Sequence, residues 1–156
     1  MSSKRTSVIA GVGLAILLVV LFAWPSFNNP DKQTIATWNS QGIACLTNGH
    51  SNTSLHFHPR LQIFVDGVEE IIPANIGIVK RCMSETHTHD ASGTIHIESF
   101  DGSKQFYLKD FYMVYNQTIE REGYILKMMV DNKESQELGS LLLKDKQKIV
   151  LEYTKK

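Results

Sequence analysis

The sequence predicts an α+β domain, with a mostly antiparallel sheet and one short helix, that follows a single N-terminal transmembrane helix. Three patterns support this prediction. The chain opens with a long uncharged apolar run, its middle part alternates apolar and polar residues with a period of two, and a later segment carries apolar residues at helical spacing. Period-two alternation indicates half-buried strands, whereas recurrence after three and four residues indicates an amphipathic helix.

The apolar run covers residues 8–24 and ends at Pro25. A helix of this length rises about 25 Å, which is at the short end of what crosses a bilayer. Lys4 and Arg5 precede the run, and positive residues favour the cytoplasmic side of a membrane. We therefore expect a single-pass protein of the cell membrane, with residues 1–25 as its cytoplasmic tip and transmembrane anchor.

A cleaved signal peptide is the alternative, because it has the same charged start and apolar centre. Ala23 supplies a small residue, but Leu21, two positions earlier, fits an A-x-A cleavage site poorly. Both alternatives place the following residues outside the cytoplasm. Residues 26–40 are polar and contain several asparagines, so we expect a loop-like linker before an extracytoplasmic domain of residues 41–156.

Two hairpins are predicted at the start of this domain. Residues 55–65 alternate, and an Asp-Gly turn signal then leads into a return strand over residues 68–72. Residues 94–98 alternate again, and after a second Asp-Gly signal residues 105–108 are expected to pair back with them. A loop is expected after the first hairpin, through Pro73, Gly77 and Cys82.

Apolar and aromatic side chains at helical spacing then predict a short helix over residues 109–116: Leu108, Phe111, Tyr112 and Tyr115. Strands are expected over residues 124–130 and 148–153, with a compact turn between them. From Thr94 onward the order is strand, strand, helix, strand, turn and strand. This order resembles a β-grasp domain with an extra hairpin in front of it.

The charge balance argues against a nucleic-acid-binding protein. Lys and Arg together number 16, as do Asp and Glu, and no basic block is present. Such a chain offers no electrostatic footprint for a phosphate backbone. The sequence also has no nucleophile motif, phosphate-binding loop or paired carboxylate motif that would indicate an enzyme.

The chain has two cysteines, Cys45 and Cys82. An oxidising compartment outside the cytoplasm permits a disulfide between them. The alternative is that one of them is a thiolate ligand of a metal ion.

The histidines are the strongest functional signal. All six lie between residues 50 and 96, and four of them form the His-x-His pairs His56/His58 and His87/His89. Residues two apart on a strand point to the same side, about 6–7 Å apart at Cα. Two such pairs that meet can surround one ion, and imidazole suits copper and zinc.

Three further residue types extend the candidate site. His96 lies on the polar face of the next predicted strand, and Asp90 directly follows the second pair, as a ligand or as an acceptor that orients a ring. Glu85 and Glu98 are weaker candidates of the same kind. We therefore predict one copper or zinc ion held by these histidines. A structural or pH-responsive polar cluster is the alternative.

A family resemblance supports this interpretation. The matching pieces are HFHPRLQIFVDG, IPANIGI, the cysteine at position 82, HTHDASGTIHIES and FYLKDFYMVY. They resemble a family of uncharacterised membrane-anchored, extracytoplasmic proteins of ammonia-oxidising archaea and some bacteria. The resemblance implies an extracytoplasmic location and clustered histidines, but no established activity. The chain departs from the family at Leu108-Lys109-Asp110, where members have a Leu-Gly-x-Phe-Phe-like helix start.

Two other metal motifs fit less well. His-Thr-His-Asp is similar to the His-x-His-x-Asp-His motif of metallo-β-lactamases, but the aspartate comes one position early and Ser92 stands at the sixth position. A blue-copper site needs a Cys thiolate and an axial Met, and no Met follows Cys82 and His87 at the usual distance.

The function predicted from sequence is therefore metal capture, delivery to a neighbouring membrane enzyme, or redox chemistry by a membrane-anchored protein. One rival is a small metal-dependent enzyme with a three-histidine site and a carboxylate base. The other is an interaction module or accessory subunit, in which the histidines only support the structure.

Overall fold

The computed structural model describes residues 29–47, 49, 51–80 and 82–156. The predicted anchor lies outside these residues. Within the described part of the chain, no helix combines the length and the apolar character needed to cross a membrane. Residues 35–156 form one compact unit, and residues 29–34 belong to a separate one.

Helix α2 (Pro30–Ser40) replaces most of the predicted linker, so the expectation of a loop over these residues is wrong. The side chain of Asn29 accepts hydrogen bonds from the backbone N–H groups of Asp31, at 3.0 Å, and Lys32, at 3.4 Å. Asparagine is a preferred N-cap, and proline suits the first helical position. Trp38 is buried in the core, which stabilises the later turns of the helix.

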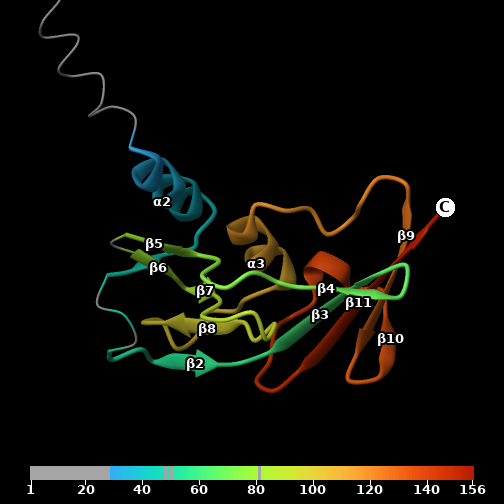
Figure 1. The fold of residues 1–156 in the computed structure, drawn as a ribbon. Helices are drawn as coiled ribbons and strands as arrows, with labels where there is room; N and C mark the ends of the chain where they lie inside the picture. The colour runs from blue at the N-terminus through green and yellow to red at the C-terminus, as the bar shows by residue number, and fades with distance from the viewer. Residues whose placement is uncertain (1–28, 48, 50, 81) are drawn as a thin grey trace, which may run out of the picture. The chain divides into compact units, whose positions relative to one another are not determined.

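A five-stranded sheet forms one part of the fold (Figure 1). Its strands, in spatial order, are β10 (Lys133–Ser135), β9 (Tyr124–Val130), β11 (Lys148–Lys155), β3 (Arg60–Val65) and β4 (Val68–Glu70). The central strands β11 and β3 are parallel, and the other neighbours are antiparallel. Helix α3 (Leu108–Tyr115) comes between β4 and β9 in the chain. The predicted strands at 124–130 and 148–153 and the predicted helix are confirmed.

This element order is that of a β-grasp domain, but a different hairpin opens it. The opening hairpin is β3–β4, closed by the predicted turn at Asp66 and Gly67, which both have positive φ angles. The predicted strand over residues 105–108 does not form. Tyr107 instead makes an isolated bridge with Leu142.

The residues between β4 and α3 complete two small antiparallel sheets (Figure 1). One contains β1 (Cys45–Leu46), β6 (Cys82–Ser84) and β5 (Ile78–Val79). The segment from Pro73 to Cys82, predicted to be a loop, supplies β5 and the start of β6. The other, called the histidine sheet below, contains β2 (Leu55–Phe57), β8 (His96–Ser99) and β7 (Thr86–His87).

The strand predicted over residues 55–65 is divided at His58 and Pro59. Proline has no N–H to donate to a strand ladder, and its ring restricts the residue before it. The break lets β2 join the histidine sheet while β3 joins the five-stranded sheet. The division therefore separates His56 and His58 from β3, although the sequence pattern placed all of these residues on one strand.

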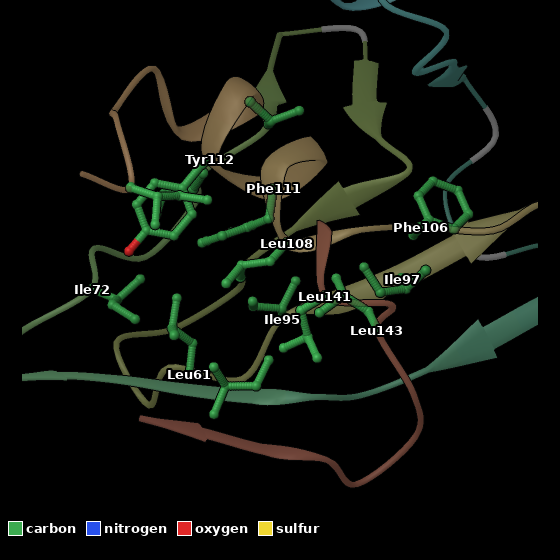
Figure 2. Packing of buried hydrophobic residues seen from close by; sticks show 14 of the residues in the cluster. Leu61, Ile72, Ile95, Ile97, Phe106, Leu108, Phe111, Tyr112, Leu141 and Leu143 are labelled. Carbon is green, nitrogen blue, oxygen red and sulfur yellow. The ribbon is translucent and has the colours of Figure 1, made fainter. Parts of the chain in front are cut away.

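One hydrophobic core supports both the sheet and the histidine strands. Figure 2 shows Leu61 of β3, Ile95, Ile97 of β8, and Leu108 and Phe111 of α3 packed close together. All five are fully buried. Because Ile95 and Ile97 anchor this strand in the core, the side chains that alternate with them point the other way.

The predicted disulfide is confirmed. It joins Cys45 on β1 to Cys82 on β6, with the two Cα atoms 5.3 Å apart, a usual separation for a disulfide. Because both thiols are in this bond, neither cysteine is available as a thiolate ligand. The blue-copper alternative therefore lacks its sulfur ligand.

Candidate metal centre

The histidine sheet presents four polar side chains on one face. Its central strand β8 carries His96 and Glu98, which point to the same side because they are two residues apart. His96 is paired with His87 on β7, and Glu98 is paired with His56 on β2. Residues directly opposite each other on antiparallel strands share a face, so all three strands contribute to one cluster.

The second histidine of each predicted pair joins the same cluster. The ring centroids of His58 and His89 each lie 4.5 Å from that of His96, and His87 lies 5.3 Å from it. The structure therefore brings together the five histidines predicted as ligands: His56, His58, His87, His89 and His96.

The ligand atoms of these histidines fall into two groups that share one member. We call His56, His58 and His96 the outer triad, and His87, His89 and His96 the inner triad. In each triad the nitrogens lie within 4.8 Å of one another and could hold a metal ion. The sequence predicted that the two pairs would surround one ion together. In the structure each pair instead forms its group with His96.

One pair in the inner triad, His87 and His89, has the nitrogen spacing of two ligands on one ion. The Nδ1 of the fully buried His87 lies 2.9 Å from the carbonyl oxygen of Ser84. A carbonyl can only accept, so Nδ1 carries the proton and the lone pair of the neutral ring is on Nε2. The Nε2 atoms of His87 and His89 are 3.2 Å apart. Two nitrogens on one tetrahedral zinc are about 3.3 Å apart, given bonds of roughly 2.05 Å.

Thr88 lies between His87 and His89 in the sequence, and its hydrogen bonds hold this segment in place. Its hydroxyl donates to the carbonyl of Pro73 at 2.9 Å and accepts from the N–H of Ile76 at 3.1 Å. The Thr88 backbone also donates to Ile76 and accepts from Asn75. The loop over residues 73–76 therefore determines the position of the second histidine pair.

The outer triad is held by a different segment. The backbone N–H of His58 donates to the Asp145 carboxylate at 3.0 Å, and its carbonyl accepts from Lys146 at 3.1 Å. The His56 side chain is 42% exposed. The outer triad therefore lies at the solvent side of the cluster.

Glu98 connects the two triads. Its side chain is fully buried, and its Oε1 lies 3.3 Å from Nε2 of His56 and 3.9 Å from Nε2 of His87. A buried carboxylate is costly unless a cation or hydrogen-bond donors compensate it. Glu98 therefore favours positive charge between the triads. The sequence signal for this residue is its position two residues after His96 on an alternating strand, which puts both side chains on one face.

The other two predicted carboxylates have different surroundings. Asp90 belongs to neither triad, is exposed, and accepts a hydrogen bond from the Ser92 N–H at 2.9 Å. The pKa of Asp90 is lowered, mainly by the Ser92 hydrogen bonds and to a smaller extent by the charges of His96 and His89. Asp90 thus lies near the cluster as a negative charge.

Glu85 serves the fold. Its buried carboxylate accepts from the Ala44 N–H at 2.7 Å and the Ser99 hydroxyl at 2.6 Å, and it pairs with Lys104. These partners tie β8 to the segment before β1. A role for Glu85 as metal ligand or general base has no support in this arrangement.

Comparisons of this chain with protein-family models, with curated proteins and with solved structures found no match.

Proposed function

We propose that this chain is a membrane-anchored, extracytoplasmic protein that captures a copper or zinc ion with its histidine cluster and delivers it to a neighbouring membrane protein. The observation that carries the proposal is the meeting of five histidines from three strands, two of them with Nε2 atoms 3.2 Å apart. Clusters of neutral imidazoles bind copper and zinc in preference to calcium or magnesium.

The exposure of the cluster supports capture and delivery over a purely structural role. Structural zinc sites are closed by four protein ligands. Here each group contains three histidines, and His56 and His89 are exposed at its solvent side. A partner's ligands can therefore reach an ion in this cluster and compete for it.

Export of the domain is supported by the predicted anchor, with its preceding positive residues, and by the disulfide. Disulfides persist in oxidising compartments and are rare in the cytosol. A tethered domain outside the cytoplasm would meet metal ions before they reach a membrane enzyme.

Metal content is the direct test. The full-length chain, purified in detergent without a polyhistidine tag, is loaded with Cu²⁺ or Zn²⁺, desalted and measured by elemental mass spectrometry. We expect one ion in the wild type and a large loss in the His87→Ala/His89→Ala double variant. His50→Ala, which removes the one histidine outside the predicted cluster, is the control and should retain the ion. A wild-type chain that binds neither ion would refute the proposal.

A small metal-dependent enzyme is the second candidate, and Glu98 is the observation that favours it. Catalytic zinc sites use three protein ligands and leave a position for water. A carboxylate beside such a site can accept the water's proton. Turnover of activated esters by the zinc-loaded chain, lost in Glu98→Gln with zinc still bound, would favour the enzyme. Equal background rates in both would exclude it for that substrate class.

A further inference from the structure

We propose that the cluster holds one divalent ion in either of two subsites and passes it from the outer triad to the inner triad, with His96 as the ligand common to both. This inference rests on the proposed function and adds the route that the ion takes. It starts from the observation that the donor atoms form two overlapping groups of three.

The two groups are too widely spread for a single five-ligand site. Two nitrogens bound to one zinc can be at most about 4.2 Å apart, twice the length of a zinc–nitrogen bond. The nitrogens of each triad lie within 4.8 Å of one another, but the five together do not form one such group, so at least one nitrogen of one pair lies more than 4.8 Å from a nitrogen of the other pair. An ion that is bound by one pair must therefore leave it in order to be bound by the other.

Exposure and rigidity give the transfer a direction. Each triad has one exposed histidine, His56 or His89, but the outer triad has no buried member, so an ion from solvent or from a donor protein reaches it more readily. The inner triad includes the fully buried His87, whose ring is oriented by the Ser84 carbonyl. Preorganised ligands lose less entropy when they bind, so we expect the inner triad to hold the ion more tightly.

Charge favours one ion at a time. Glu98 and Asp90 are carboxylates that interact electrostatically with these histidines. Their negative charges favour a bound divalent cation. A second divalent cation that shared His96 would be close to the first, and like charges at short range repel strongly.

Transfer by ligand exchange keeps atoms and charges in balance. The bonds from the ion to His56 and His58 break, bonds to His87 and His89 form, and the ion remains divalent. Because His96 belongs to both triads, one ligand stays within reach throughout the exchange. Glu98, which lies near one histidine of each pair, provides a negative charge along the route.

Two single variants provide a matched test, because each removes an exposed histidine that belongs to one triad only: His56→Ala and His89→Ala. Exposed side chains contribute little to the core, so both variants should fold, which far-UV circular dichroism verifies. The full-length chain in detergent is mixed with Zn²⁺ in a stopped-flow instrument to measure loading. Release is then measured with excess EDTA, and the zinc content by elemental mass spectrometry.

We expect one zinc per wild-type chain. His56→Ala should still hold one zinc but load it several-fold more slowly than the wild type. His89→Ala should load at close to the wild-type rate but release zinc to EDTA several-fold faster. Two zinc ions per wild-type chain, or equal loading and release in the two variants, would overturn the transfer route and leave metal capture intact. No zinc in the wild type would instead refute the proposed function itself.

Discussion

Gly77 links the fold to the inner triad, and replacing it tests that link. A Cβ atom at this position would lie 2.7 Å from the Thr86 carbonyl oxygen, 2.9 Å from a Val114 methyl and 3.1 Å from the His87 Cβ. Its φ angle of +76° is also one that side-chain-bearing residues rarely adopt. Gly77→Ala should therefore displace β7 and with it the buried His87.

The expected cost has two parts. A non-glycine residue in the left-handed region costs about 1–2 kcal/mol. Overpacking against a well-packed neighbour costs about 1–3 kcal/mol more, so the free energy of unfolding should fall by about 2–5 kcal/mol in total. Gly123→Ala is the matched control, because Gly123 has a φ angle of +80° and no atom within 4 Å of its ideal Cβ position. The control should lose only the first part, about 1–2 kcal/mol.

Urea denaturation of the two variants and the wild type, without metal and in the same detergent, measures these costs. Zinc affinity is then measured by competition with a chromophoric chelator under conditions in which each variant is folded. We expect Gly77→Ala to weaken zinc binding and Gly123→Ala to leave it unchanged. If Gly77→Ala is no less stable than the control and binds zinc as tightly as the wild type, the claimed contact between residue 77 and β7 is wrong.

Three further predictions concern the carboxylates and the disulfide. Glu98→Gln keeps the shape of the side chain and removes its charge. It should weaken zinc binding about 10–100-fold in the same competition assay, as loss of a supporting group around a metal site typically does. An unchanged zinc affinity would show that Glu98 does not support the site. Cys45→Ser/Cys82→Ser should lose about 3–4 kcal/mol of stability in urea, given the loop that the disulfide closes, and reduction of the wild type should reproduce this loss. Arg121 donates two hydrogen bonds to the Glu70 carboxylate and lowers its pKa. The stabilisation from this pair should therefore be complete above the pKa of Glu70 in the unfolded chain, about 4.3, and disappear as the pH falls through the lowered pKa of the folded state. Since both side chains are partly exposed, Glu70→Gln should cost about 0.5–1 kcal/mol at pH 7 and nothing in strong acid, and a cost that is independent of pH would contradict this reasoning.

Local patterns predicted much of the fold correctly. The Asp66-Gly67 turn, the helix around Phe111 and the strands over residues 124–130 and 148–153 formed where the sequence indicated them. These elements depend on interactions between residues close in the chain, such as turn dihedrals and same-face spacing. The start of helix α2 also has a signal in the sequence, because Asn29 and Pro30 are an N-cap and a first-turn residue, although the polar composition of the segment favours a loop.

Strand pairing could not be read from the same patterns. Period-two alternation shows which face a residue occupies, but not which strand lies beside it. The strand that contains Ile95 and Ile97 was therefore expected to pair with residues 105–108, whereas β8 pairs with β2 and β7. The break at Pro59, which redirects β2 into the histidine sheet, has its cause in the sequence but its consequence only in the packed fold.

The sequence by itself determined that all six histidines and both cysteines belong to this domain, and that the two residues of a His-x-His pair on a strand point to one side. Tertiary structure alone decided that each pair forms its group with His96, that Glu98 lies between the triads, and that Glu85 serves the fold. The physical reason is the range of the interactions. Side-chain direction along a strand is local, whereas the neighbours of a metal ligand are set by hydrogen bonds between strands far apart in the chain.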